Sequence, residues 1–344
     1  MKDPDTSTNP NVLAISVVIP VRNEEDSVRL LLEALLGQIV PPKEIVITDG
    51  GSVDSTREII EEFISGGAAV KLIRERASLP GRARNVAVKH SRCDWIAFID
   101  AGNQPAPNWL ASLAGKIGDG SMVDVVYGSY EPVVDSFFKE CAAIAYVPPA
   151  ASTAEGPARP RSIVSALMRR RVWEEVGGFP EHLRSAEDLL FMNKIEQAGF
   201  RIARAPQAVV YWTIQSGLWS MFRRFSVYAR NNIRAGLWRH WQAALFQRYA
   251  LIAIAALPAI FVGAKWLFVP SLLWLALLIA RAVRALVQNR TSYPAGVFRN
   301  GLRLLLIVPI IATLDAATFA GTISWFFGDR LRLAPKKHDD NSSE

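Results

Sequence analysis

Cysteine is scarce in this chain, and so are the features of a secreted protein. Its 344 residues include two cysteines, Cys93 and Cys141, which cannot form a disulfide framework. The first residues, MKDPD, are polar and do not contain the apolar core of a signal peptide. We therefore expect the bulk of the chain to stay in the cytoplasm.

A single basic stripe with interleaved aromatic residues, as expected of a nucleic-acid-binding protein, is also missing. The net charge is +7, but many basic residues lie between 223 and 248 and between 281 and 303, beside long apolar runs. Such flanking charge is typical of juxtamembrane segments that face anionic lipid and the cytoplasm. We expect membrane lipid as a partner and no nucleic acid.

Half of the residues are hydrophobic, and the excess is concentrated in the last third of the chain. This distribution separates a globular part from a membrane part. The predicted regions are a flexible N-terminus (1–13), a globular domain (14–215), an amphipathic juxtamembrane segment (216–243), a membrane region (244–328) and a polar tail (329–344).

Three apolar runs are long enough to cross a bilayer, which takes about 20 residues. The runs at 244–264 and 267–287 predict a helical hairpin, and the basic residues at its outer ends place those ends in the cytoplasm. The third run, 302–327, contains Asp315 and precedes a basic tail. Its length favours a third span, whereas its charges favour a re-entrant or interfacial helix.

In the globular part, short apolar runs rich in β-branched residues alternate with segments of helical periodicity. This order predicts an α/β fold with a mostly parallel central sheet. In such sheets, ligands bind beyond the carboxyl ends of the strands. The polar segments at 20–25, 49–54 and 100–103 each follow a predicted strand, so we expect them to converge on one edge.

Five motifs occur in an order that resembles the family 2 glycosyltransferases of the GT-A fold, over roughly residues 14–230. Each motif alone is weak evidence, whereas five in register are specific. They are residues 16–24 (SVVIPVRNE), 47–56 (ITDGGSVDST), 81–85 (GRARN), 98–103 (FIDAGN), and Gly-Gly-Phe at 177–179 followed by Glu187 and Asp188.

The resemblance implies a nucleotide-sugar site. Asp49 would accept N–H groups of a uracil or guanine ring, with Pro20 and Glu24 shaping the base and ribose pocket. Arg84 would hold the nucleotide or its phosphates, because a guanidinium suits a bidentate contact with oxyanions. The simpler alternatives are that Asp49 is a turn residue and Arg84 a surface arginine. Asp54 is equally well explained as a helix cap.

Residues Asp100 and Ala101 occupy the place of the family's metal-binding Asp-x-Asp motif, beside the donor phosphates. The second acid is replaced by Gly102, with Asn103 next to it. A divalent metal, Mg²⁺ or Mn²⁺, remains the expected cofactor, with Asp100 as its ligand and Asn103 as a possible helper. The departure leaves open whether cations such as Arg84 take over part of the charge neutralisation.

Asp188 is the predicted general base, because displacement at an anomeric carbon needs a carboxylate near the acceptor hydroxyl. The resemblance implies a single displacement with inversion of configuration. Glu187 would orient the site or contact the acceptor. The alternative is that both acids stabilise the N-terminus of a helix, and both explanations can hold together.

The combined prediction is a non-processive, inverting glycosyltransferase with a cytoplasmic catalytic domain, held in the cell (inner) membrane by several helices. Its donor would be a nucleotide-sugar, preferably a UDP-sugar, and its acceptor a lipid-linked saccharide or glycolipid of cell-envelope synthesis. Two alternatives remain. One is sugar transfer to polyprenyl phosphate itself, and the other is a degenerate protein that binds nucleotide-sugar without catalysis.

Overall fold

The structure is a computed structural model that describes residues 13–118, 122–153 and 156–330. The chain divides into two compact units. The first, here called the catalytic unit, runs to residue 132 and includes 150–213; the second, the helical unit, comprises 133–149 and the residues from 214 onward. The predicted domain bounds stay a prediction; in the structure residues 133–149 group with the C-terminal helices.

An eight-stranded sheet forms the centre of the catalytic unit, in the order β3-β2-β1-β4-β9-β6-β10-β5. Its strands are β1 (Ile15–Val21), β2 (Glu44–Asp49), β3 (Val70–Arg74), β4 (Trp95–Phe98), β5 (Asn103–Pro105), β6 (Val125–Val133), β9 (Ala166–Arg169) and β10 (Ile202–Thr213). The first four strands pair in parallel, in register Val18↔Val46 and Val18↔Phe98. The predicted GT-A-type sheet is confirmed. The prediction did not include the antiparallel pairs that β9 makes with β4 and β6.

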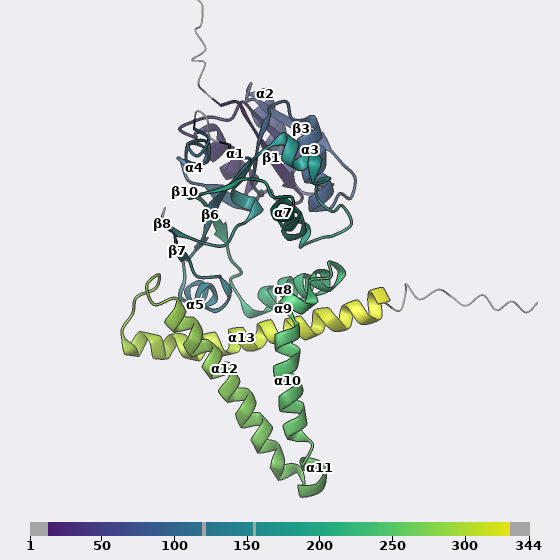
Figure 1. The fold of residues 1–344 in the computed structure, drawn as a ribbon, viewed down its shortest axis with the longest axis vertical. Helices are drawn as coiled ribbons and strands as arrows, with labels where there is room; N and C mark the ends of the chain where they lie inside the picture. Colours follow the sequence, from purple (N-terminus) through teal and green to yellow (C-terminus); the bar gives the residue numbers. More distant parts are fainter. Residues whose placement is uncertain (1–12, 119–121, 154–155, 331–344) are drawn as a thin grey trace, which may run out of the picture. The chain divides into compact units, whose positions relative to one another are not determined.

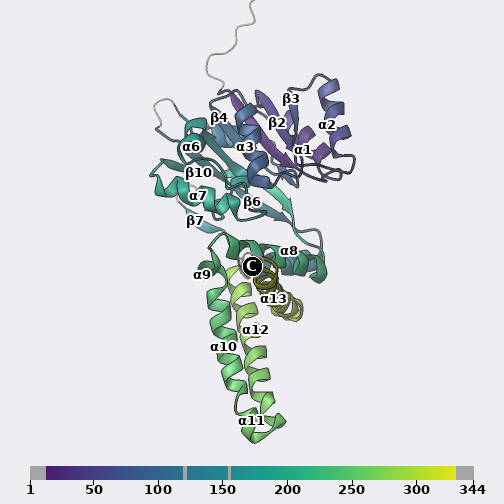
Figure 2. The same cartoon turned by 90° about the vertical axis from the view of Figure 1, so that its right-hand side faces the viewer.

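Helices cover both faces of this sheet (Figures 1 and 2). They are α1 (Val28–Leu36), α2 (Thr56–Ser65), α3 (Pro80–His90), α4 (Trp109–Ala114), α6 (Arg170–Glu175) and α7 (Glu187–Gln197). Successive strand residues point to opposite faces, so Val17 packs in one hydrophobic core and Val18 in the other. Burial on both faces explains why β1 and β2 are almost uninterrupted apolar runs. A short hairpin of β7 (Ala151–Thr153) and β8 (Gly156–Ala158) completes this unit.

The helical unit contains a helical hairpin and one long helix. Its helices are α5 (Phe137–Tyr146), α8 (Leu218–Arg234), α9 (Trp238–Trp241), α10 (Ala243–Ala256), α11 (Ala259–Val262), α12 (Phe268–Gln288) and α13 (Val297–Trp325), the last continued by a π-helical turn, Phe326–Arg330. Among the residues that the structure describes, three stretches are long and apolar enough to cross a membrane: Ala243–Val262, Ala264–Gln288 and Val297–Asp329. The first two agree closely with the predicted runs, and the third begins five residues before the predicted 302.

Within the helical unit, α10 and α12 lie antiparallel, whereas α13 runs across the end of this hairpin (Figures 1 and 2). At the other end of the hairpin, the Trp266 Nε1–H donates to the carbonyl of Ala255 at 2.9 Å. α8 and α9 occupy the segment assigned from the sequence to an amphipathic juxtamembrane region. α13 packs against both α8 and α5.

Candidate active site

The loops that follow β1 and β2 hold each other in place. The Asn23 amide donates to Ser52 Oγ at 2.9 Å, and the Val53 amide returns a bond to Asn23 Oδ1 at 2.9 Å. The Glu24 amide donates to Thr56 Oγ1 at 2.8 Å. Asn23 adopts a φ of 56°, a conformation that asparagine tolerates better than most residues. These bonds bring the first two predicted motifs together at one edge of the sheet.

Asp49 and Asp54 have different surroundings. Asp49 is buried, and its Oδ1 accepts bonds from the Ser52 amide at 2.9 Å and from Ser52 Oγ at 2.5 Å. Its other oxygen lies 3.7 Å from Arg57 Nε. Asp54 Oδ1 accepts from the amide and hydroxyl of Thr56, the first residue of α2. Asp54 therefore holds the first residue of this helix, whose N-cap residue is Ser55, while a contact of Asp49 with a nucleotide base stays a prediction.

The segment after β4 places Asp100 at the same edge. Its side chain is about one-third exposed (36%), and its Oδ1 accepts from Arg84 Nη2 at 2.7 Å. Ala101 is buried, and Pro20 is half-buried at the end of β1. A Cβ atom added to Gly102 would lie 3.9 Å from Glu24 Oε2. Glu24 thus places a carboxylate beside the position where the family's second acid would begin.

Arg84 is the centre of the charge network. It is only 3% exposed, and its Nη1 donates to Glu187 Oε1 at 2.6 Å while Nη2 holds Asp100. Burial alone would lower the pKa of the guanidinium, but the neighbouring carboxylates, Asp100 foremost, raise it above its ordinary value. The predicted surface alternative for Arg84 is therefore wrong. One buried cation thus joins Asp100 to Glu187, the neighbour of the predicted base.

Glu187 and Asp188 form the first turn of α7. Burial raises the pKa of Glu187, and the Arg84 guanidinium only partly offsets this. Burial likewise raises the pKa of Asp188, again with Arg84 opposing the shift. The preceding residue, Ala186, has a φ of 69°, which costs a non-glycine residue of order 1 kcal/mol. The strained turn directs two acids with raised pKa into the site, as expected for proton transfer.

Asn85 holds the loop before these acids, a role that sequence reasoning missed. Its Oδ1 accepts from the Phe179 amide and from Trp173 Nε1, both at 2.9 Å, and its Nδ2 donates to the Phe179 carbonyl at 2.9 Å. Gly178 has a φ of 70°, and an added Cβ would approach Asn85 Oδ1 to 2.8 Å. Only glycine fits at position 178. The Gly-Gly-Phe motif was the feature of the sequence that could have pointed to this loop.

The carboxylates near Gly102 are hard oxygen ligands of the kind that a divalent metal binds. Among the residues that the structure describes, no group of three or more His, Cys, Asp or Glu side chains is arranged to hold an ion. Asp100, with the Glu24 carboxylate beside Gly102, offers one or two hard oxygen ligands, which suits Mg²⁺ bound through a nucleotide. Asn103 lies in β5, where it pairs with Trp212.

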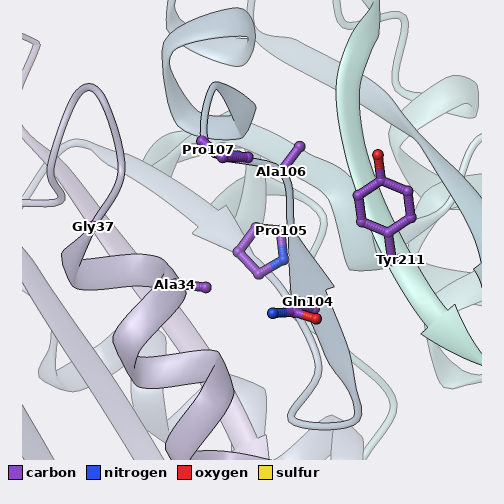
Figure 3. Close-up of a pocket in the computed structure, with 7 residues that line it drawn as sticks. All are labelled: Ala34, Gly37, Gln104, Pro105, Ala106, Pro107 and Tyr211. Carbon is purple, nitrogen blue, oxygen red and sulfur yellow. The ribbon is translucent and has the colours of Figure 1, made fainter.

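A separate hollow lies at the edge of the sheet, beside β5 and β10 (Figure 3). Its volume is about 330 Å³, and its lining includes Ala34, Gln104, Pro107 and Tyr211. It contains none of the predicted site residues and no carboxylate. The predicted site residues around Arg84 are thus separate from this hollow.

Comparison with known proteins identifies a family and a shared fold. The sequence profile of the family described as Glycosyl transferase family 2 matches residues 16–177. The glycosyltransferase AglE of Haloferax volcanii is 30% identical over 210 residues, which cover 59% of this chain and 67% of AglE. The succinoglycan biosynthesis protein ExoA of Rhizobium meliloti is 25% identical over 80% of this chain and 87% of ExoA.

Other relatives are longer, and the solved structures are more distant. The chain spans 44% of the pre-mycofactocin glycosyltransferase of Mycobacterium tuberculosis, at 27% identity. A mannosyltransferase from Pyrobaculum calidifontis, solved with GDP-Man and Mn²⁺, superimposes with a TM-score of 0.54 over 92% of this chain and 87% of its own, at 21% identity. That likeness shows the shared fold.

Proposed function

Because the chain belongs to the family 2 glycosyltransferases, we propose that it is an inverting enzyme that moves a sugar from a nucleotide-sugar to a membrane-associated, lipid-linked acceptor. The observation that carries the proposal is the Arg84 bridge between Asp100 and Glu187. Arg84 would fix the distance between Asp100, at the donor phosphates, and Glu187, beside the base Asp188. Rigid placement of reacting groups is a main source of catalytic rate.

In the proposed reaction, Asp188 takes the proton of the acceptor hydroxyl as its oxygen attacks the anomeric carbon. The bond from that carbon to the diphosphate oxygen breaks, and the nucleoside diphosphate leaves from the opposite face, which inverts the configuration. A group with a raised pKa accepts a proton more readily at neutral pH. Glu187, held by Arg84, would keep the acceptor hydroxyl oriented toward Asp188.

The diphosphate requires positive charge as it leaves. A bound Mg²⁺ or Mn²⁺ would neutralise that charge. Asp100 would hold the ion, with help from Glu24 or Asn103, and Arg84 would add its own positive charge from behind Asp100. The Pyrobaculum mannosyltransferase, solved with Mn²⁺, supports this use of metal. Asp49, with Pro20 and the backbone at Ala101, would bind the nucleotide, for which we favour UDP.

The apolar helices support the proposal of a lipid-linked acceptor. Three helical stretches are long and apolar enough to cross a bilayer, and a lipid-linked saccharide is the simplest reason for an enzyme to be anchored there. We place the enzyme in the cell membrane with its catalytic domain in the cytoplasm, where nucleotide-sugars are made. ExoA, a protein of succinoglycan biosynthesis, supports a role in cell-envelope polysaccharide.

The test is a transfer assay on the full chain in membranes, with UDP- and GDP-sugars and extracted lipid acceptors. The expected product is a lipid-linked saccharide with inverted anomeric configuration. Transfer to polyprenyl phosphate alone, which gives a phosphate ester cleaved by mild acid, would replace the proposed acceptor. Binding of nucleotide-sugar without turnover, unchanged in Asp188→Asn, would instead identify a non-catalytic binding protein.

A further inference from the structure

The long helix α13 is tied at its N-terminal end to α5. Glu140, on α5, accepts from Arg299 Nη2 at 2.5 Å and from Arg303 Nε at 2.6 Å. Arg303 is only 3% exposed, so the ion pair of Arg303 with Glu140 is a buried contact that holds the two helices together. The first turns of α13 are therefore fixed to a segment that begins four residues after strand β6.

The C-terminal end of α13 is tied to α8. A Cβ atom added at Gly321 would lie 2.3 Å from the Ser226 carbonyl oxygen, so the two helix backbones are in close contact there. Just beyond α13, Asp329 accepts from Arg230 Nη2 at 2.7 Å and from Arg234 Nη2 at 2.6 Å. α8 begins five residues after strand β10. Both ends of α13 are thus fixed to segments that adjoin the catalytic sheet in the sequence.

The middle of α13 rests on the helical hairpin. Asp315 is buried and accepts from Arg281 Nη1 on α12 at 2.5 Å and from the Tyr249 hydroxyl on α10 at 2.9 Å. The Trp274 Nε1–H donates to the same hydroxyl at 3.1 Å. This cluster joins three helices at the level where α13 crosses α10 and α12 (Figures 1 and 2).

From these contacts we infer that α13 lies in the plane of the membrane, within the leaflet on the catalytic side, and that the chain crosses the bilayer twice. In a spanning α13, Arg303 and Asp329 would be about 39 Å apart along the membrane normal. α8 runs alongside α13, so its last turn would then lie on the side of the bilayer opposite to α5. Both segments begin within five residues of strands of one sheet, so α8 itself would have to cross much of the hydrocarbon core.

The polarity of α8 leads to the same conclusion. It carries Arg223, Arg224, Arg230 and Arg234 and runs alongside α13. A spanning α13 would draw this helix toward the hydrocarbon core, where arginine is costly. In the plane of the membrane, the same arginines lie at the level of anionic headgroups, where basic residues are favourable.

The outer face of α13 is suited to lipid along its whole length. Exposed apolar residues spaced 3, 4, 7 or 11 positions apart fall on one side of the helix: Phe298, Leu302, Leu305, Ala316, Ile323 and Phe327. The charged residues Arg303 and Asp315 are buried in ion pairs inside the unit. This distribution is what an in-plane helix with one face in the acyl region requires.

The dimensions of the helical unit also agree with two crossings and an in-plane α13. Beyond the Tyr249–Arg281 level, each arm of the hairpin has about 13 residues, or about 20 Å of helix. The thickness of α13 adds about 10 Å, which brings the total to the roughly 30 Å of a hydrocarbon core. Lys265 and Trp266, at the tip, then reach the opposite interface, where such residues are enriched.

The experiment measures sidedness in the full chain, in right-side-out and inside-out vesicles of the native membrane, with a membrane-impermeant maleimide. Single cysteines are placed at Val53, Lys265 and Ser343. Val53 and Lys265 are exposed, and the native Cys93 and Cys141 are buried. Val53→Cys reports the catalytic side, and Lys265→Cys reports the tip of the hairpin.

The expected result is that Ser343→Cys and Val53→Cys are labelled in the same vesicles and Lys265→Cys in the opposite ones. Labelling of Ser343→Cys together with Lys265→Cys would overturn the in-plane helix in favour of a third span. Labelling of all three from one side would overturn the two crossings. None of these results depends on transferase activity, so the inference can fail while the proposed function stands, or the reverse.

Discussion

Two buried arginine–carboxylate clusters, one in each unit, use the same chemistry with opposite charge balance. Around Arg84, three acids (Asp100, Glu187 and Asp188) contribute to the field of one cation. Around Glu140, one acid meets two cations, Arg299 and Arg303. In the first cluster, burial raises the pKa of Glu187 and of Asp188, and the single arginine offsets this only in part. In the second, burial opposes ionisation, but the two arginines lower the pKa of Glu140 below its ordinary value.

The comparison separates reactive clusters from structural ones. A buried carboxylate with too little positive charge beside it retains proton affinity, which a base needs. A buried carboxylate with ample positive charge is a fixed anion that holds two helices together. The predictions below test this contrast, from the largest expected effect to the smallest.

Replacing Asp188 by Asn removes the proton acceptor while keeping the shape of the side chain. We expect the turnover number to fall by roughly 10²–10⁴-fold, the usual contribution of a general base, with donor affinity little changed. The measurement is transfer rate and nucleotide-sugar binding on the same preparation. The matched control is Glu174→Gln, an exposed acid before the Gly-Gly-Phe loop. An active Asp188→Asn enzyme would assign the base elsewhere.

Replacing Glu140 by Gln leaves Arg303 buried without its counter-charge. Removing one partner of a buried pair costs about 3–5 kcal/mol, so thermal unfolding in detergent should shift strongly while donor binding is retained. Arg299→Gln is the control, because that side chain is 55% exposed and its loss should cost far less. Equal stability of the two variants would contradict the structural role given to this cluster.

Replacing Arg84 by Lys keeps the charge but removes the forked contact with Asp100 and Glu187. A displacement of about 1 Å at a reacting group can cost on the order of 10²-fold in rate, so we expect kcat to fall by that order. KM should change less, because the cation remains. A rise in KM at unchanged kcat would instead show that Arg84 binds the nucleotide directly.

The acid limb of the pH–rate profile should lie above the ordinary range of an aspartate. Burial raises the pKa of Asp188, so activity is lost as pH falls through that raised value. The free energy of unfolding changes with pH in the opposite direction. The folded state binds the Asp188 proton more tightly than the unfolded state does. The resulting stabilisation is therefore present below the pKa of Asp188 in the unfolded state and is lost as pH rises through its pKa in the folded state. Asp188→Asn should remove this part of the pH dependence of unfolding.

The smallest effect is expected at the incomplete metal motif. Gly102→Asp restores the family's second acid, and its Cβ has ordinary contact distance to Glu24. We expect Mn²⁺ to bind up to roughly tenfold more tightly in the presence of UDP, the lower end of the effect of ligand-supporting groups. Glu24→Gln should weaken the binding of Mn²⁺. Calorimetric titration measures both, and insensitivity of Mn²⁺ affinity to both changes would leave Asp100 as the sole protein ligand.

Much of the fold followed from local pattern. The first two strands were predicted to end at residues 19 and 48, where an apolar run gives way to turn residues, and the observed strands end one or two residues later, at Val21 and Asp49. The hairpin helices were predicted to within a few residues, because length and apolarity decide a membrane helix. By contrast, β9 and β6 lie in the sheet next to strands that are far away in sequence, and no local signal encodes that pairing or its antiparallel direction.

The sequence by itself determined the family motifs, the order of alternating strands and helices, and which segments are apolar enough to enter lipid, because these depend on neighbouring residues. Only the tertiary structure decided that Arg84 is buried between two acids, that Asn85 holds the Gly-Gly-Phe loop, and that α13 packs against α5, α8 and α12. The hydrogen bonds that make these contacts join residues 16 to 163 positions apart. The free energy of a buried ion pair or hydrogen bond is set by what surrounds it in space, and the chain order does not state those surroundings.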